Sequence, residues 1–435
     1  MRFSVKASAL AFILCWSVPG IVQSFDSQPP PEFESTYEYP ELLTPHAPSA
    51  TLEYLDVVVL ALFLAATTLC VLKFRSRISI SILTIGSVVY FGFFRKGCVC
   101  PVASFQNIAL ALFNPSYFIP ITVILLFVLP LITTLLFGRT FCASVCPIGA
   151  IQDIVVFKPQ KVPIWLERPL RFLPVLYLGF AVLFAATGAE FIVCRFHPFL
   201  AFFRFGGSFE MLILGGLFLL IGLFIARPYC RFLCPYGVLL GWISKLSNRH
   251  TTITPDTCVD CRLCEDSCPF DAIQKPVKAD SLPERVKDRK KLLVALLAIP
   301  LLAAAGGGIG FLIHPTLSRM HSSVRLADQI AKEDAGVTTE MTLESETFRG
   351  STRSKEELWG EVQQIVVRFR TGSIFLGIFI GAVFATTFIR TYLRRSRTGY
   401  EPDKERCLSC ARCFAYCPSE HLRVGRFKRW PRGLI

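Results

Sequence analysis

Seven apolar runs dominate this chain of 435 residues. Each is close to the ~20 residues that an α-helix needs to cross a ~30 Å hydrocarbon layer. The runs lie near residues 55–72, 79–94, 119–137, 173–192, 209–226, 292–313 and 373–393. The composition agrees, because 52% hydrophobic residues and 39 Phe are too apolar for a set of soluble domains. The predicted fold class is therefore mainly α, a polytopic helical membrane protein with about seven spans.

The residues before the first run predict export of the N-terminus. Arg2 and Lys6 precede an apolar stretch, which is the layout of a signal peptide over residues 1–24. Residues 25–53 form an acidic, proline-rich arm without Lys or Arg, too poor in apolar residues to fold alone. We expect this arm on the periplasmic side.

The basic residues set the orientation of the spans. The net charge of +14 comes largely from Lys and Arg in loops beside apolar runs, so nucleic acid is not an expected partner. If the N-terminus lies outside, successive loops alternate between the two sides of the membrane, and the basic loops fall inside, as the positive-inside rule requires. Arg95 and Lys96 are exceptions that fall outside. The predicted inner segments are residues 73–78, 138–172, 227–291 and the tail from residue 394.

One cysteine pattern, C-x-x-C-x-x-C-x-x-x-C-P, occurs twice. A tight turn with this spacing presents three thiolates to one cubane cluster while the fourth reaches a neighbouring cluster. A disulfide framework would not repeat this spacing together with the proline, and zinc sites show paired C-x-x-C instead. The pattern predicts two [4Fe-4S] clusters facing the cytoplasm. The predicted ligands are Cys258, Cys261, Cys264, Cys268, Cys407, Cys410, Cys413 and Cys417.

The two motifs are far apart in sequence, so shared ligation requires docking. In bacterial two-cluster ferredoxins the last cysteine of each motif serves the other cluster. We expect the same crossed ligation here, because an isolated motif of this size has little core of its own. The prediction is a small cytoplasmic α+β ferredoxin-like module formed by residues 249–285 and 394–435.

A second repeat lies in the membrane region. Residues 138–149 align with residues 226–237 at a fixed offset of 88, and each copy contains C-x-x-x-C-P. The two cysteines of each copy share one helical face. A four-thiolate metal or redox site, free buried thiols, and a disulfide within each pair all remain open. The residues concerned are Cys142, Cys146, Cys230 and Cys234.

Extending the repeat backwards brings Cys98 and Cys100 opposite Cys194, at the outer ends of spans. With His197 nearby these could form a mixed ligand set like a Rieske centre, and a structural or disulfide role is the alternative. His197 and His314 could serve haem or quinol, or be interfacial histidines. No C-x-x-C-H occurs, so c-type haem is not expected, and Cys70 reads as a core residue.

These motifs resemble the membrane polyferredoxins of the NapH, NosR and CcoG type, above all the NosR-like core. The resemblance covers most of residues 79–285 and the C-terminal motif. It implies an electron-transfer protein of the bacterial cytoplasmic membrane that links quinol oxidation to a periplasmic redox enzyme. NosR-like members carry a large periplasmic flavin domain that the arm cannot provide, and no flavin-attachment motif is evident in residues 314–371, so FMN is not expected.

Three hypotheses about function follow. The first is electron transfer from membrane quinol through the two clusters and the membrane cysteines toward a periplasmic enzyme or carrier, as a component of a quinol dehydrogenase. The second is an assembly factor that supplies electrons for building a metal centre, and the third is a cluster-based membrane sensor. No catalytic residue or oligomeric state is predicted. The expected domains are 1–24 signal peptide, 25–53 arm, 54–248 membrane core, 249–285 first ferredoxin segment, 286–313 transmembrane helix, 314–371 periplasmic segment, 372–393 transmembrane helix and 394–435 second ferredoxin segment.

Overall fold

The structure is a computed structural model that describes residues 50–97, 101–253, 258, 260–276, 285–338, 341–351, 353–392 and 399–423. The chain divides into two compact units. The larger contains His46–Arg325 and Gly360–Ile435, and the smaller contains Met1–Pro45 and Leu326–Trp359. The predicted signal peptide, the arm up to residue 49, Cys98 and Cys100 lie outside the described residues.

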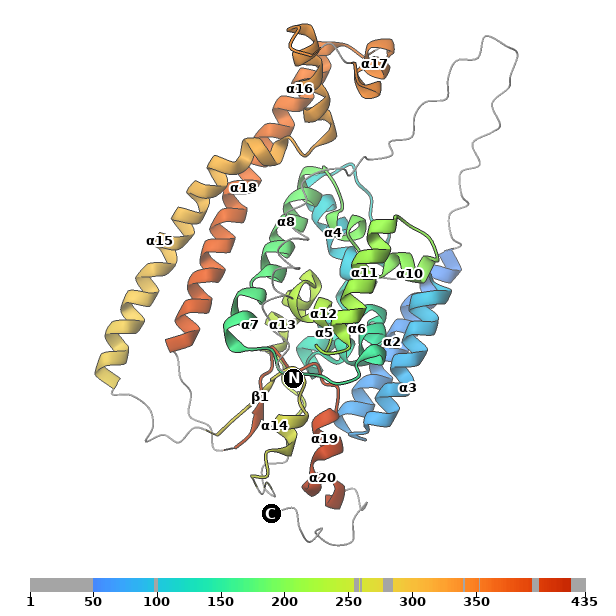
Figure 1. The fold of residues 1–435 in the computed structure, drawn as a ribbon, viewed down its shortest axis with the longest axis vertical. Coiled ribbons are helices and arrows are strands. Elements are labelled where there is room, and N and C mark those ends of the chain that lie inside the picture. Colours follow the sequence, from blue (N-terminus) through green and yellow to red (C-terminus); the bar gives the residue numbers. More distant parts are fainter. Residues whose placement is uncertain are drawn as a thin grey trace, which may run out of the picture. The chain divides into compact units, whose positions relative to one another are not determined.

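The chain is mainly helical (Figure 1). The first helices are α2 (Ala50–Leu72), α3 (Arg77–Ser87), the π-helical turn η1 (Val88–Phe94), α4 (Pro101–Phe113), α5 (Ile121–Phe137), the π-helical turn η2 (Phe141–Val145) and α6 (Pro147–Val155). The next are α7 (Ile164–Leu170), α8 (Leu173–Thr187), α9 (Ile192–Arg195), α10 (Leu200–Arg204), α11 (Phe209–Gly222), α12 (Pro228–Phe232) and α13 (Pro235–Ser244). The remaining elements are α14 (Leu263–Ser267), β1 (Ile273–Gln274), α15 (Arg285–Ser318), α16 (Ser322–Asp334), α17 (Leu343–Gly350), α18 (Lys355–Tyr392), β2 (Glu401–Pro402), α19 (Arg412–Tyr416) and α20 (Pro418–Arg423).

Five helical stretches among the described residues are long and apolar enough to cross a membrane. They are Thr51–Leu72, Arg77–Phe94, Ile164–Thr187, Leu296–Ser318 and Lys355–Thr387. The mainly helical, membrane-spanning character predicted from the sequence is therefore confirmed. Two predicted spans form shorter helices: α5 begins after Pro120 and has 17 residues, and α11 ends at Gly222 and has 14.

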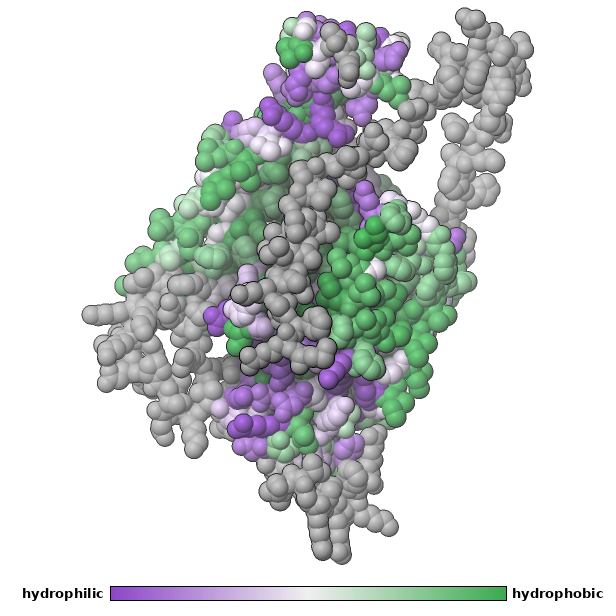
Figure 2. Space-filling model, viewed as in Figure 1, coloured by the Kyte–Doolittle hydropathy of each residue, from purple (hydrophilic) through white to green (hydrophobic). Residues whose placement is uncertain are grey.

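Apolar side chains cover the outer face of the larger unit. Figure 2 shows hydrophobic residues gathered over α2 and α3, where Leu62 is 63% exposed, Ile82 64% and Ile85 56%. In water so large an apolar surface would be costly, whereas in hydrocarbon it is the expected one. The short helix α4, by contrast, has a buried face that includes Phe105 and Gln106.

Close backbone contacts join α15 to α18. A Cβ added at Gly306 would lie 2.1 Å from the carbonyl oxygen of Gly377, and one added at Gly310 would lie 2.0 Å from that of Ser373. Only glycine permits these approaches, and small residues at such spacing are how helices pack in membranes. Because α15 follows the first ferredoxin segment and α18 precedes the second, this contact helps return both segments to one place.

The smaller unit is folded by polar contacts. Thr342 and Ser345 form a capping box at the start of α17. Glu333 at the end of α16 accepts a hydrogen bond from Ser345 Oγ at 2.7 Å, and Arg349 pairs with both Glu333 and Asp334. The described part of the predicted segment 314–371 is therefore largely helical rather than an extended spacer.

The two ferredoxin segments dock onto each other in the larger unit. Strand β1 pairs antiparallel with β2, with Ile273 opposite Pro402 and Gln274 opposite Glu401. The Asp403 amide donates to the Ala272 carbonyl at 2.7 Å, which extends the contact beyond the strands. Two segments separated by α15 to α18 thus build one small module with helices α14 and α19.

Candidate iron-sulfur sites

The two ferredoxin-type motifs follow the same backbone path. Asp260 and Arg262 in the first motif have left-handed φ values of 56° and 60°. Ser409 and Ala411, at the same positions of the second motif, have φ values of 54° and 57°. Residues other than glycine rarely adopt this conformation, and such strain concentrates at functional sites. Each path then enters a helix of five residues, so the first three thiols of each motif lie on a tight turn.

The first three cysteines of the first motif share a cavity with the last cysteine of the second. Cys258, Cys261, Cys264 and Cys417 line a space of about 20 Å³ that is closed by Ile253 and Tyr400 among other residues. Cys268, the fourth cysteine of the first motif, is not among the described residues that line it. This grouping is the one that crossed ligation requires.

Cys268 lies with the second motif instead. It packs with Cys407 and Cys410 in one apolar cluster and with Cys413 in another. Burial raises the pKa of the Cys407 thiol to about 12, with smaller contributions from the thiols of Cys410 and Cys268. A buried thiol of this kind remains protonated at neutral pH unless a metal replaces the proton.

These two groupings fit the ligand set of a cubane cluster. Each iron of such a cluster takes its own thiolate, so four sulfurs surround a space instead of converging on one ion. In the described part of the chain, no three His, Cys, Asp or Glu side chains come together in the way that a single metal ion requires. The eight predicted cysteines thus fall into two groups of four, and their ligation of two clusters stays a prediction.

The four cysteines of the C-x-x-x-C-P repeat meet at one place. All of Cys142, Cys146, Cys230 and Cys234 line a second cavity of about 20 Å³. Cys146 and Cys234 have extended backbone, and the proline after each begins α6 or α13. All four cysteines have free thiols in the structure. The sequence repeat thus becomes a single four-thiol site.

Each copy of the repeat also places an arginine against the other copy. Arg139 and Arg227 occupy equivalent positions 88 residues apart. A Cβ added at Gly149 would lie 3.2 Å from an Arg227 Nη atom, and one added at Gly237 would lie 3.3 Å from an Arg139 Nη atom. The glycine two residues after each Cys-Pro therefore leaves room for a guanidinium.

Hydrogen-bond donors reach the sulfurs of this four-thiol site. Gln152 Nε2 lies 3.3 Å from Cys230 Sγ, the Gly237 amide lies 3.3 Å from Cys234 Sγ, and Arg139 Nη2 lies 3.6 Å from Cys142 Sγ. Donors of this kind favour the thiolate and set the potential of any bound cluster. Burial nevertheless outweighs these donors and raises the pKa of the Cys230 thiol to about 11, so this sulfur remains protonated at neutral pH unless a metal replaces the proton.

Arg227 lies between the four-thiol site and the ferredoxin module. Its side chain is 1% exposed and donates to the Ala143 carbonyl at 2.8 Å. Burial lowers the pKa of Arg227, but Asp153 and the thiols of Cys230 and Cys410 outweigh burial and raise it. Cys410 belongs to the second ferredoxin motif, so one guanidinium is close to both groups of sulfurs.

Asp153 connects the membrane core to the second ferredoxin segment. Its carboxylate contacts Arg77 at 2.5 Å, Arg412 at 3.1 Å and Arg227 at 3.5 Å. Burial opposes ionisation, yet the three guanidinium groups outweigh it and hold the pKa of Asp153 well below its usual range. Arg77 also donates to the Cys410 carbonyl at 3.2 Å, so the same contacts hold the second cluster motif.

The remaining predicted residues, Cys194, His197 and Cys70, line neither the ferredoxin-type sites nor the four-thiol site. Cys194 is exposed, and because Cys98 and Cys100 lie outside the described residues, the hypothesis of an outer three-cysteine site stays a prediction. His197 is buried beside Tyr229, with ring centroids 6.4 Å apart, and its Nδ1 has no hydrogen-bond partner in the described chain. Cys70 packs against Val71 and Ile80, as a core residue would.

Sequence reasoning missed the polar residues around the thiols. Arg139 and Arg227 are part of the repeat, so their equivalent positions were a usable signal. Gln152 and Asp153 have no polar counterpart in the second copy of the repeat. The equivalent positions, 88 residues later, are Leu240 and Gly241. The partners of Gln152 and Asp153 come from α3, α12 and α19, which only the tertiary structure brings together.

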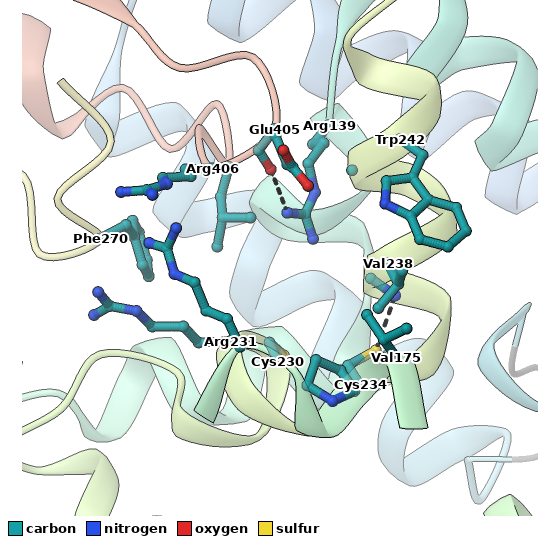
Figure 3. A pocket seen from close by; sticks show the side chains of 15 residues that line it. Arg139, Val175, Cys230, Arg231, Cys234, Val238, Trp242, Phe270, Glu405 and Arg406 are labelled. Carbon is teal, nitrogen blue, oxygen red and sulfur yellow. Dashed lines mark hydrogen bonds between the residues drawn. The ribbon is translucent and has the colours of Figure 1, made fainter. Parts of the chain in front are cut away.

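A larger cavity of about 130 Å³ lies beside Cys230 and Cys234 (Figure 3). Helices α8 and α13 form one side, and residues of the ferredoxin module, including Phe270 and Leu408, form another. Arg139 reaches from the membrane core to the Glu405 carbonyl at 2.9 Å along its edge. No motif or pattern in the sequence indicated this cavity.

Family comparisons identify iron-sulfur domains at these places. A 4Fe-4S binding domain matches residues 119–164 and 208–254, which contain the two C-x-x-x-C-P pairs. A second 4Fe-4S binding domain matches residues 251–274, which contain the first ferredoxin motif. The second motif, residues 407–417, lies outside the matched residues. Iron-sulfur binding is thus shown for the chain, without the number of clusters.

Curated relatives agree with these matches. YccM of Escherichia coli, which is named as an electron transport protein, is 32% identical over 189 residues, 39% of this chain and 52% of YccM. The methylamine utilization ferredoxin-type protein MauN of Paracoccus denitrificans is 30% identical, over 30% of this chain and 48% of MauN. The regulatory protein NosR of Stutzerimonas stutzeri is 26% identical, over 43% of this chain and 28% of NosR.

The chain is similar to ferredoxin-type electron transport proteins of the NapH/NosR type. The predicted resemblance is therefore confirmed, and the 4Fe-4S binding domains together with the apolar helices support a membrane-associated iron-sulfur protein. The chain spans about half the length of the first curated relatives that it matches, with 52% of YccM and 56% of a Methanocaldococcus jannaschii protein covered. No solved structure matches it.

Proposed function

We propose that this protein carries electrons from the membrane quinol pool to a periplasmic redox enzyme or carrier through three sulfur sites. Two are crossed [4Fe-4S] sites in the ferredoxin module, and the third is the four-thiol site of the C-x-x-x-C-P repeat. When bound, such clusters accept and release single electrons at potentials set by burial and hydrogen bonds. The observation that carries the proposal is the convergence of four repeat cysteines on one cavity next to the second ferredoxin motif.

Contact between the sites supports transfer between them. Cys142 of the repeat and Cys268, Cys407 and Cys410 of the module pack against one cluster of buried residues that includes Ala226 and Leu408. Arg227 fills the space between them and excludes water, since its side chain is 1% exposed. Its fixed positive charge would stabilise added negative charge at either site.

The membrane topology completes the proposal. We infer seven membrane spans, with α5 and α11 as short ones, which would put both ferredoxin segments in the cytoplasm and residues 314–371 in the periplasm. Basic residues in the inner loops, including Arg75 and Arg77, support this orientation. A path toward the periplasm would then continue from the four-thiol site, either through the outer cysteines or through a partner.

Electron paramagnetic resonance of quinol-treated membranes tests the function. We expect cluster signals that appear on adding a reduced quinone analogue and disappear on reoxidation. Partner-enzyme activity should be lost with quinol as donor in a Cys230→Ser, Cys234→Ser variant but persist with an artificial donor. Full enzyme activity that depends on this protein only during enzyme assembly would instead support the maturation hypothesis. Clusters that quinol never reduces would exclude the proposed function.

A further inference from the structure

A cavity of about 540 Å³ lies at one end of the membrane core, where α2 meets the ferredoxin module. Its wall includes Leu69 and Leu72 from the last turn of α2, and Phe137, the last residue of α5. Phe414 of α19 adds a side from the second ferredoxin segment. Ligand sites in proteins typically have volumes of about 300–1,000 Å³. The cavity is therefore large enough for a small ligand or for the head group of a lipid.

The polar part of the cavity wall is basic. The side chains that can carry a positive charge are Lys73, Arg75, Arg249 and His250. No Asp or Glu is among the described residues of the wall. Arg75 is paired with Glu420 at 2.8 Å. Burial and the charge of Lys404 lower the pKa of His250, so this ring is neutral at pH 7. Lys73 and Arg249, by contrast, are exposed and form no ion pair within the described part of the chain.

The ends of α2 and α5 do not cancel these two positive charges. A helix C-terminus carries a partial charge of about −0.5, located on carbonyl oxygens that lack a partner. Here the Leu69 carbonyl accepts from the amides of Lys73 and Phe74 at 2.9 and 3.1 Å. The Leu136 carbonyl accepts from the Arg249 amide at 2.9 Å, which also fixes the backbone of Arg249 at the end of α5. The cavity thus keeps a positive potential that attracts an anion.

The position of the cavity favours a lipid over a soluble anion. Leu72 ends the candidate span Thr51–Leu72, and Lys73 follows it directly, so the cavity lies at the level of a membrane surface. Leu69 is 53% exposed and Phe74 59% exposed, which gives the basic cavity an apolar border. Basic pockets between transmembrane helices bind the phosphate head groups of anionic lipids. Only a lipid would use both the charges and the apolar border.

We propose that this cavity binds the head group of an anionic phospholipid, with its phosphate held by Lys73 and Arg249 and its acyl chains along α2. A zwitterionic lipid fits less well, because its ammonium group would enter a basic cavity whose described wall has no carboxylate. The site does not depend on the electron-transfer function proposed above.

A lipid in this cavity would connect the membrane core to both ferredoxin segments. Lys73 follows the membrane helix α2, Arg249 begins the first ferredoxin segment, and Phe414 belongs to the second. The turn between α2 and α3 lies beside α19 (Figure 1). Thr251 Oγ1 lies 3.2 Å from Ser409 Oγ, so the loop that carries Arg249 also contacts the second cluster motif.

Native mass spectrometry of the purified full-length protein in detergent tests the site, with phosphatidylglycerol and phosphatidylcholine of equal chain length as probes. We expect phosphatidylglycerol to bind at least about tenfold more tightly. The double variant Lys73→Gln, Arg249→Gln should weaken phosphatidylglycerol binding at least about tenfold, because each basic residue near an anionic lipid contributes about fivefold in affinity. Its binding of phosphatidylcholine should not change.

The matched control is Lys158→Gln, Arg168→Gln. It removes two exposed basic residues from the predicted inner segment 138–172 that do not line the cavity, and it should bind phosphatidylglycerol as the wild type does. Equal affinity of the wild type and the cavity variant for phosphatidylglycerol would overturn the proposal. An equal loss in the control would also overturn it, since net charge alone would then explain binding. So would displacement of the lipid by an equal concentration of inorganic phosphate, which would indicate a site for a soluble anion.

Folding is controlled separately. Each variant must retain the wild-type iron content and dithionite-reducible signal. If the cavity variant does not, the wild type is labelled instead with a phosphatidylglycerol that carries a photoreactive head group. Labels should then fall on residues 68–75 or 249–252, and labels confined to other segments would reject the site.

Discussion

The two ferredoxin segments share one local structure but are attached to the membrane core in different ways. The second segment is held by buried or half-buried contacts: Asp153 pairs with Arg412, Arg75 with Glu420, and Ser244 donates to the Lys404 carbonyl at 2.7 Å. The first segment has fewer charged contacts with the core: Arg231 donates to the Pro269 carbonyl, and an exposed pair joins Lys161 and Asp266. It also contacts the core through the Arg249 amide, which donates to the Leu136 carbonyl at 2.9 Å, and through Phe270, which packs with Ala226.

The difference indicates an order of attachment. The second segment forms the base of the module on the core, and the first docks mainly on the second through the β1–β2 pairing and the packing of α14 on α19. The cysteine set nearest the four-thiol site, which includes Cys407 and Cys410, thus belongs mainly to the second segment, the one with more contacts to the core. Substitutions at the second segment should therefore have larger effects than equivalent ones at the first.

The largest expected effect, loss of a cluster signal, should follow substitution of Cys268 or Cys417, the fourth cysteine of each motif. Cys417→Ser should remove the same cluster signal as Cys258→Ser, because both residues line one cavity. Cys268→Ser should remove the same signal as Cys407→Ser. Each change deletes one thiolate of a four-thiolate set, which a hydroxyl replaces poorly. Resonance spectra and iron content of the four purified variants provide the measurement.

The matched pairs make crossed ligation easy to reject. If Cys268→Ser and Cys258→Ser lose the same signal while Cys407→Ser loses the other, each motif holds its own cluster. The different attachment of the two segments allows a second test, in which the hydrogen exchange of each segment is compared after loss of one cluster. Loss of the Cys407 cluster, on the base of the module, should also loosen the first segment, whereas loss of the Cys258 cluster should leave the second segment protected from hydrogen exchange.

The next largest effect should follow Asp153→Asn. The amide cannot balance the buried charge of Arg227, nor those of Arg77 and Arg412, and removing one partner of a buried ion pair costs about 3–5 kcal/mol. We expect faster hydrogen exchange over residues 399–423, with α2 and α8 unchanged. Unaltered exchange over residues 399–423 would mean that Asp153 is not the main attachment of the second segment.

The sequence was sufficient to predict the features that depend on local spacing. Apolar length predicted membrane helices, and the spacing of Cys258 to Cys268 predicted the tight turn whose left-handed residues the structure shows. The fixed offset of the C-x-x-x-C-P pairs also led to the four cysteines that meet. What could not be predicted depends on residues that are distant in sequence, such as Asp153 with Arg412, or on cavities between elements.

A smaller effect is expected at the helix pair that joins the two segments. Gly306→Leu would push a side chain into the backbone of Gly377, and overpacking of this kind costs about 1–3 kcal/mol. Gly308 on the same helix has open space around it, so Gly308→Leu is the matched control. Thermal stability in detergent should fall for Gly306→Leu alone. Equal loss in both variants would point to helix propensity rather than to contact between α15 and α18.

The smallest effect should come from Asp266→Asn in the first segment. The Lys161–Asp266 pair is 3.4 Å apart with side chains 42% and 74% exposed, and exposed pairs contribute about 0–1 kcal/mol. Hydrogen exchange over residues 260–276 should therefore match the wild type, and added salt should not change it. An effect as large as that of Asp153→Asn would contradict the proposed order of attachment, because the first segment would then have its own strong contact with the core.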